Sequence, residues 1–354
     1  LLSEGLGWVE GSLSDFFVWL QAPEWLRGVV VDGMFRVLFW VVSVMLPPMA
    51  IFFPLFTLLE DLGYLPRIAF NLDKYFKKAC ACGKQALTTC MGFGCNAAGV
   101  VGCRIIDSPR ERLIAILTNN FVPCNGRFPT LIAIITMFFI GVAGGFGSTV
   151  LSALCLTGII VLGVVMTLLM SRLLSKTILK GVPSSFTLEL PPYRKPQIGK
   201  VIVRSIFDRT LFVLGRAAAV AAPAGIIIWL TANIMIGDAS LLSHCAAFLD
   251  PFAQLFGMDG VILMAFILGF PANEIVIPLI IMAYMAQGSL MDMSNLAELK
   301  TLLVDNGWTW LTAVCTMLFS LMHWPCSTTC LTIKKETQSL KWTAVSFLLP
   351  TACG

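Results

Sequence analysis

Gly-Phe-Gly-Cys-Asn at residues 92–96 and Gly-Phe-Pro-Ala-Asn at residues 269–273 are two versions of one short stretch, and they decide the fold. Each is followed further along the chain by a Pro-Cys pair, at residues 123–124 and 325–326. Gly and Pro interrupt helices, and all four positions lie in or beside strongly apolar segments. Broken helices at corresponding positions of two halves are typical of membrane transporters with a site near the bilayer midplane.

The composition is that of a membrane protein. Hydrophobic residues make up 57% and charged residues 12% of the 354 positions, and the mean hydropathy is +0.86. Soluble domains have about 45–50% and about 25% respectively. Several windows exceed the roughly 20 apolar residues that span a bilayer core. The sequence therefore predicts an all-α, polytopic membrane protein with broken or re-entrant helices in two inverted repeats.

Positive charge is concentrated in three segments, which sets the topology. Residues 64–112 hold eight Lys or Arg, residues 172–209 hold eight, and residues 334–341 hold three, so these contain 19 of the 24 basic residues. By the positive-inside rule all three are cytoplasmic. Residues 237–259 carry three Asp and no Lys or Arg, and residues 288–306 are also mainly acidic, so both are expected outside.

This topology places the two echoed stretches on opposite sides of the membrane. Residues 92–96 should dip in from the cytoplasm, and residues 269–273 from outside, which is the inverted-repeat arrangement. Breaks are also expected in three spanning segments, at Pro47-Pro48, at residues 123–126 and at Pro325-Cys326. The predicted organisation is an external amphipathic interfacial segment (1–28), a first gate repeat (29–171), a cytoplasmic basic loop (172–209) and a second gate repeat, truncated at its C-terminus (210–354).

Glu274 follows the second echoed stretch inside an apolar run. A carboxylate at membrane depth is costly and is by default a functional-site hypothesis. The alternative is a structural partner for an intramembrane arginine, such as Arg216 or Arg127. We favour the functional interpretation and include Asn273, whose amide oxygen stands beside the carboxylate in sequence.

Three cysteines, Cys95, Cys124 and Cys326, each lie at a predicted helix break. Thiolates suit late first-row transition metals, and Asn96 would add a neutral oxygen. A mixed sulfur, amide and carbonyl site suits a divalent ion that must bind and then leave. The alternative is that cysteine is merely a small residue at tight packing, but three cysteines at repeat-related breaks favour the metal interpretation. The twelve cysteines are not a disulfide framework, and Cys80-Ala81-Cys82 is a weaker candidate for a soft metal.

Secondary candidates lie near the same breaks. His323 is three residues before Cys326 and could share its helix face, although a buried histidine is more often a packed residue. Cys330 is one helical turn beyond Cys326. Glu60 and Asp61 end the first crossing, either as a cytoplasmic ion relay or as an interfacial helix end. No enzyme signature is present, so a catalytic role is not predicted, and the net charge of +4 gives no reason to expect a nucleic-acid partner.

The motif set resembles the membrane domain of the ferrous iron transport protein B (FeoB) family. The resemblance covers essentially the whole chain in order. It rests on Leu-Leu-Glu-Asp-Leu-Gly-Tyr (58–64), the stretch at 92–96, Asp107 to Arg112 with Pro123-Cys124, Glu-Leu-Pro-Pro-Tyr-Arg (189–194), and His-Trp-Pro-Cys (323–326) with Ile-Lys-Lys-Glu-Thr (333–337). Asn273-Glu274 stands where many members have Lys-Glu, which keeps the carboxylate and removes a cation.

This resemblance implies a multi-pass bacterial inner-membrane importer of Fe(II) with two gate motifs. The family's metal-path cysteines would be Cys95, Cys124 and Cys326, and the second gate residues 269–277. In the family a GTP-binding domain precedes the membrane domain, so GTP and Mg²⁺ would act only through a domain missing before Leu1, in cis or on another chain. Further expected partners are membrane lipid, a small FeoA-like cytoplasmic protein and a second copy of the chain.

Two alternatives remain at this stage. A nucleoside-type carrier could share the gate architecture, but it would need polar and aromatic groups to hold a base and a sugar, and the chain has only four Tyr. A non-transporting membrane scaffold or sensor would not need repeat-related breaks.

Overall fold

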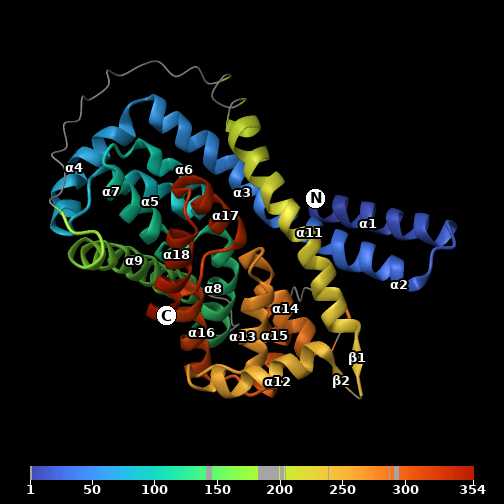
Figure 1. Ribbon diagram of the computed structural model, residues 1–354. Helices are drawn as coiled ribbons and strands as arrows, with labels where there is room; N and C mark the ends of the chain where they lie inside the picture. The colour runs from blue at the N-terminus through green and yellow to red at the C-terminus, as the bar shows by residue number, and fades with distance from the viewer. Residues whose placement is uncertain are drawn as a thin grey trace. The chain divides into compact units, whose positions relative to one another are not determined.

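The computed structural model describes residues 2–140, 146–181, 199, 203, 205–237, 239–286, 288–290 and 295–354, and these are almost entirely helical (Figure 1). The strands within these ranges are β1 (Met235–Ile236) and β2 (Ala239–Ser240), which pair antiparallel. The predicted all-α fold class is confirmed. Most of the basic loop at 172–209, with its Glu-Leu-Pro-Pro-Tyr-Arg motif, and most of the glycine-rich turn near 141–147 lie outside the described residues.

Four helical segments are long and apolar enough to cross a bilayer. They are Glu24–Asp61, Pro109–Phe139, Gly147–Lys176 and Val213–Asn233. Helices satisfy every backbone hydrogen bond within the segment, which is why they can cross lipid. The main helices in these segments are α3 (Arg36–Asp61), α9 (Phe146–Lys176) and α11 (Leu211–Asn233). The chain is therefore a multi-pass membrane protein, as its composition predicts.

The first crossing corrects one prediction. A break was expected at Pro47-Pro48, but α3 continues through Pro47, Pro48 and Pro54 without ending. A proline removes one backbone donor, and a membrane helix tolerates this where neighbouring groups satisfy the freed carbonyl. In this chain, a proline without a nearby Cys or Asn therefore predicts a helix break less well than Gly or Pro within two residues of Cys or Asn.

The chain folds into two compact units, each assembled from several segments. Unit 1 contains Leu1–Met45, Pro129–Leu156 and Gly215–Ser320, and unit 2 contains Leu46–Phe128, Thr157–Leu214 and Leu321–Gly354. Each unit draws segments from both predicted repeats, 29–171 and 210–354.

Unit 1 is built around the second echoed stretch. Helix α13 (Gly260–Leu268) packs against α12 (Leu241–Gln254) and against α14 (Val276–Tyr284). The approach of α12 and α13 requires glycine, because a Cβ atom on Gly260 would lie 2.0 Å from the carbonyl oxygen of Ala246. Further helices of this unit are α1 (Leu2–Trp19), α2 (Glu24–Arg27), η1 (Gly28–Phe35), α15 (Leu296–Asp305) and α16 (Trp310–Met322) up to residue 320.

Unit 2 is built around the first echoed stretch. Helix α6 (Asn96–Gly102) packs against α5 (Lys84–Gly94) and α17 (Ser327–Thr337), over a core that includes Val100, Cys103 and Ile333. Other helical elements of this unit are α4 (Tyr64–Lys78), η2 (Cys103–Ile105), α7 (Pro109–Thr118), η3 (Asn119–Phe121), η4 (Asn125–Arg127), η6 (Ser205–Thr210) and α18 (Leu340–Cys353).

Candidate ion site at the helix breaks

The two echoed stretches break their helices in the same way. Helix α5 ends at Gly94, and Cys95 is extended, with φ −156° and ψ 125°, before α6 begins at Asn96. In unit 1, α13 ends at Leu268 and Ala272 is extended, with φ −155° and ψ 118°, before η7 (Asn273–Ile275) leads into α14. The predicted breaks at both stretches are confirmed. Their matching dihedral angles show that the sequence echo is also a conformational one.

The two Pro-Cys pairs also interrupt helices, as predicted. Cys124 is extended between η3 and η4, and Cys326 is extended between α16 and α17. Backbone donors and acceptors at such breaks lack helical partners. In unit 2 three breaks, at residues 95–96, 119–127 and 321–326, leave groups of this kind, and three polar side chains bind many of them.

Asn119 occupies a space that two glycines leave open. Its Nδ2 atom donates to the carbonyl oxygen of Asn96 at 3.0 Å. A Cβ atom on Gly92 would lie 2.9 Å from Asn119 Oδ1, and one on Gly99 would lie 2.7 Å from both side-chain polar atoms. The glycines on α5 and α6 are therefore required by the asparagine between them. Its Oδ1 atom is buried and has no hydrogen-bond partner in the described part of the chain.

Arg127 joins the second break to the third. Its side chain is buried, at 1% exposure, and its Nη1 atom donates to the carbonyl oxygens of Asn120 at 2.9 Å and Leu321 at 2.7 Å. Its Nη2 atom donates to Asn120 Oδ1 at 3.2 Å and to the carbonyl oxygen of His323 at 3.3 Å. Positive charge at a helix C-terminus complements the free carbonyls there, so Arg127 caps the end of α16.

Asn120 and Asn96 bind further backbone groups at these breaks. Asn120 donates through Nδ2 to the carbonyl oxygen of His323 at 2.9 Å, and its Oδ1 atom accepts from Arg127. The side-chain amide of Asn96 lies 3.2 Å from Asn120 Oδ1. With its nitrogen turned toward the backbone, Asn96 donates to the carbonyl oxygens of Gly92 at 3.1 Å and Val122 at 3.3 Å.

The three predicted cysteines all lie in unit 2. Cys95 and Cys124 are buried and Cys326 is half-buried, and the thiols of Cys124 and Cys326 act electrostatically on Cys95. Cys124 and Cys326 also interact electrostatically with Arg127. Cys326 Sγ lies 3.1 Å from Thr329 Oγ1. Within the described ranges, no group of three or more His, Cys, Asp or Glu side chains is arranged so that it could hold a metal ion.

Glu274 and Asn273 lie in unit 1, at the start of η7, and both are buried. Glu274 is 4% exposed, and neither of its carboxylate oxygens has a hydrogen-bond partner among the residues that the structure describes. The structural alternative, an ion pair with Arg216 or Arg127, therefore gains no support. Burying a carboxylate without a partner is costly, so this group is suited to receiving a cation.

The secondary candidates divide into two pairs. His323 is buried in unit 2 with its ring against Trp324, centroids 5.8 Å apart, and Cys330 Sγ donates to the carbonyl oxygen of Pro325 at 3.6 Å. Both lie at the third break. Glu60 is half-buried and Asp61 is exposed at the C-terminal end of α3.

Sequence reasoning missed the side chains that organise unit 2, namely Asn119, Asn120 and Arg127. One signal was available, because an arginine within an apolar run three residues after a Pro-Cys break is as unusual as Glu274. The two asparagines carried no comparable signal, since their partners are distant in sequence: Asn119 depends on glycines 20 or more residues before it, and Asn120 binds the carbonyl oxygen of His323.

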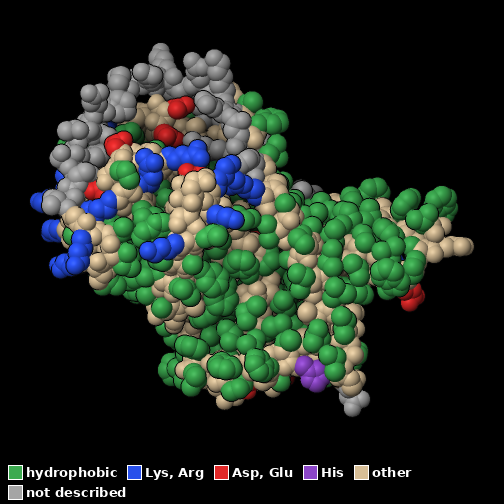
Figure 2. All heavy atoms as spheres, viewed as in Figure 1, with side chains coloured by type: hydrophobic (Ala, Val, Ile, Leu, Met, Phe, Trp, Pro, Cys, Tyr) green, Lys and Arg blue, Asp and Glu red, His purple; other side chains and the backbone are tan. Residues whose placement is uncertain are grey.

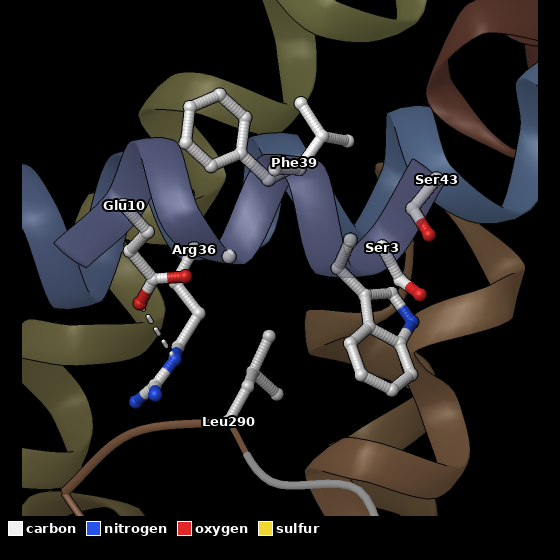
Figure 3. A pocket seen from close by; sticks show the side chains of 9 residues that line it. Ser3, Glu10, Arg36, Phe39, Ser43 and Leu290 are labelled. Atoms are coloured by element: carbon white, nitrogen blue, oxygen red, sulfur yellow. Dashed lines mark ion pairs between the residues drawn. The ribbon is translucent and has the colours of Figure 1, made fainter. Parts of the chain in front are cut away.

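A cavity of about 320 Å³ lies elsewhere in unit 1 (Figure 3). Its polar wall contains Glu10 on α1 and Arg36 on α3, whose side chains form an ion pair with Nε 3.1 Å from Oε1. Ser3, Phe39 and Leu290 also line it. None of the residues predicted from the helix breaks contributes to this cavity.

Comparison with protein-family models gives two matches. The Gate family, described as nucleoside recognition, matches residues 42–139 and 214–340. The model described as the C terminus of ferrous iron transport protein B matches residues 156–208. No solved structure shows a significant match to the chain.

Curated relatives are similar along most of the chain. The Fe(2+) transporter FeoB of Staphylococcus aureus is 30% identical over 350 residues, which cover 96% of this chain and 49% of the relative. The Leptospira interrogans transporter of the same name is 26% identical, covering 90% and 48%. A fusion of Fe(2+) transport protein A and Fe(2+) transporter FeoB from Porphyromonas gingivalis is 25% identical, covering 98% and 45%. The chain thus spans about half the length of these relatives.

Proposed function

The chain belongs to the Gate family and to the ferrous iron transport protein B group, and on this basis we propose that it carries Fe(II) into the cell through its broken helices. The relatives named Fe(2+) transporter FeoB support the substrate. The activity of the whole protein extends beyond this chain, which corresponds to about half of those relatives.

The observation that carries this proposal is the gathering of three thiols from three separate helix breaks. Cys95, Cys124 and Cys326 are distant in sequence, yet they interact in unit 2. Sulfur ligands favour late first-row ions, and backbone carbonyls at the same breaks would offer harder ligands. A ligand set that is open and mixed binds a divalent ion without closing around it, which suits an ion that must move on.

Arg127 would affect how tightly the three thiols bind the ion. Its positive charge acts on two of the three cysteines and reduces the net negative charge that the ion meets. Coulomb attraction is large where water is excluded, so an unopposed thiolate cluster would hold the ion tightly. The arginine thus favours release, and it also holds two helix breaks together.

Unit 1 would provide a second station. Glu274, buried and without a hydrogen-bond partner in the described residues, would meet the ion together with Asn273. The charge pattern of the sequence predicts that this stretch dips in from outside and residues 92–96 from inside. We therefore propose that the carboxylate station is met first during uptake and the sulfur station second.

The remaining parts of the proposal concern the whole protein. A GTP-binding domain, in cis or on another chain, would use GTP and Mg²⁺ to control the gates. The Porphyromonas gingivalis fusion protein supports a small FeoA-like partner on the cytoplasmic side. The bacterial inner membrane is the proposed location, with a homo-oligomer as a possible assembly.

The Gate family is described as nucleoside recognition, and a nucleoside-type carrier is therefore the second candidate. The thiols at the three breaks of unit 2 favour the ion, because they are small ligand atoms rather than a surface for a base and a sugar. Competition with excess nucleoside during Fe(II) uptake separates the two functions. A scaffold or sensor would show no uptake of either.

Uptake of Fe(II) by the full-length protein in liposomes, under anaerobic conditions, tests the proposal. We expect replacement of Cys95, Cys124 and Cys326 by Ser to lower the rate at least about tenfold, since losing even outer-shell support at metal sites costs 10- to 100-fold. Serine replacement of Cys155, Cys245 and Cys315, which lie away from the breaks, is the matched control and should transport normally. Normal uptake by the first triple variant would contradict the thiol path.

A further inference from the structure

Helix α4 leaves the first crossing through a sharp turn. Gly63 adopts φ +73°, a left-handed conformation that favours glycine, directly between α3 and α4. Arg67 Nη1 donates back to the Gly63 carbonyl oxygen at 2.7 Å and reinforces this turn. The next helix therefore starts in a new direction where the apolar crossing ends, within the segment that the charge pattern places in the cytoplasm.

One face of α4 packs inward within unit 2. Leu65 belongs to a cluster with Met91 of α5, and Phe76 belongs to a second cluster with Ala86 of the same helix. Ala69, between these two residues, is fully buried. Residues 65, 69 and 76 fall on one side of a helix with 3.6 residues per turn, so this face is already occupied by protein.

The opposite face combines aromatic rings with lysines. Tyr64 is 52% exposed, Phe70 is 53% exposed and Tyr75 is 62% exposed, and they share about half of the helix circumference with three exposed lysines. The lysines are Lys74, Lys77 and Lys78. Figure 2 shows Lys and Arg side chains gathered in the part of the view where Figure 1 places α4, α6 and α17.

Three neighbouring cations already have acidic partners in the protein. Arg104 forms a two-pronged ion pair with Glu336, at 2.7 and 2.8 Å. Lys84 Nζ lies 2.5 Å from Asp107, and this contact lowers the pKa of the Asp107 carboxyl. Lys77 Nζ pairs with Asp73 at 2.6 Å. Lys74 and Lys78 have no acidic partner in the described part of the chain, so their charges are available to an external anion.

We propose that α4 lies along the cytoplasmic surface of the bilayer and binds the headgroups of anionic phospholipids through Lys74 and Lys78. A helix that presents basic and aromatic residues on its outer face is typical of interfacial membrane binding. Tyrosine rings favour the headgroup level, and lysine side chains reach from there to phosphate. Anionic lipid supplies the complementary charge, because the inner leaflet is negative. This inference uses no residue of the ion site.

The test is electron paramagnetic resonance of the full-length protein in phosphatidylcholine liposomes that contain a trace of spin-labelled phosphatidylglycerol or phosphatidylcholine. The ratio of the two protein-associated fractions measures the preference for anionic lipid. The variant K74Q/K78Q removes two charges four residues apart on α4. The control K176Q/K180Q removes two exposed charges with the same spacing at the end of α9.

We expect the preference for phosphatidylglycerol to fall about fivefold or more in K74Q/K78Q, since each lysine near an anionic surface contributes a factor of about five at low ionic strength. The control should keep most of the preference, and 0.5 M salt should weaken it in the unaltered protein. An unchanged preference in K74Q/K78Q would overturn the proposal. An equal loss in both variants would also overturn it, since binding would then depend on overall charge. Both results are independent of Fe(II) uptake.

Discussion

At the scale of single residues, Glu274 shows how function can oppose stability. Its carboxylate is 4% exposed and lacks a hydrogen-bond partner among the described residues, in a unit where a structural ion pair would have supplied one. A residue kept only for stability would be neutral or paired at this position. The cost of burying the charge is explained if the group receives a cation during transport.

The variant E274Q should therefore change stability and transport in opposite directions. The amide has the same shape and no charge, so we expect the thermal unfolding midpoint to rise, with a gain of roughly 1 kcal/mol or more. Fe(II) uptake should fall at least about tenfold, as expected for a lost ligand. Both are measured on the purified full-length protein, by thermal unfolding in detergent and by liposome uptake.

The matched control is E298Q, the same change at an exposed position on α15. It should leave both measurements within error. If E274Q lowered stability and left uptake unchanged, Glu274 would be a structural residue and the carboxylate station would be wrong.

At the scale of elements, the helix breaks are held by specific polar side chains rather than by loose packing. Asn119 fills the space between Gly92 of α5 and Gly99 of α6, and Arg127 caps the end of α16. A break that lacked such partners would leave backbone groups unsatisfied at membrane depth. The glycines and the polar side chains therefore depend on one another, and a substitution of either should alter the contacts of the other.

Replacing Gly99 by Ala should test this dependence. The added Cβ would lie 2.7 Å from Asn119 Oδ1 and Nδ2, so we expect a loss of about 1–3 kcal/mol in unfolding free energy. G158A on α9, where nothing lies within 4 Å, should be neutral or slightly stabilising. Chemical unfolding in mixed micelles provides the measurement.

A double-mutant cycle with N119A tests whether the clash with Asn119 causes the loss of stability in G99A. If the clash is the cause, N119A and G99A together should cost less than the sum of the two single changes, by 0.5 kcal/mol or more. Additive costs would show that Gly99 is needed for helix packing in general and not for the asparagine.

At the scale of the whole molecule, the central prediction is topology. Charge counting places residues 64–112 in the cytoplasm and residues 237–259 outside, which makes the two gates opposed. In a cysteine-free background, a cysteine in place of Leu255 should react with a membrane-impermeant maleimide in intact cells. A cysteine in place of Lys78 should react only after the cells are permeabilised. Both positions are exposed, so accessibility depends on the side of the membrane.

Reaction of both cysteines in intact cells, or of neither, would contradict opposed gates. Neither result would affect the finding that Cys95 and Ala272 share a backbone conformation, because that finding rests on dihedral angles. The order proposed for the two ion stations would then have to be abandoned.

Much of the fold could be predicted because its signals are local. Long apolar windows give the crossing helices, and Gly or Pro within two residues of Cys or Asn marks every confirmed break. Pro47-Pro48 failed because proline by itself does not end a membrane helix whose backbone groups are otherwise satisfied. The organising residues Asn119, Asn120 and Arg127 could not be predicted in full, since their partners are contributed by other segments of the chain.

The sequence by itself determined the class of protein, its crossing segments, its helix breaks and its family, because hydrophobic length and backbone interruption act within short windows. Tertiary structure alone decided that Cys124 and Cys326 act electrostatically on Cys95, that Arg127 binds the carbonyl of Leu321, and that the Glu274 carboxylate lacks a hydrogen-bond partner among the described residues. These facts depend on which distant segments come within hydrogen-bond distance, and no local pattern encodes that. The echo of residues 92–96 at 269–273 locates two helix breaks of the same conformation, and the packing around them determines which polar groups each break presents.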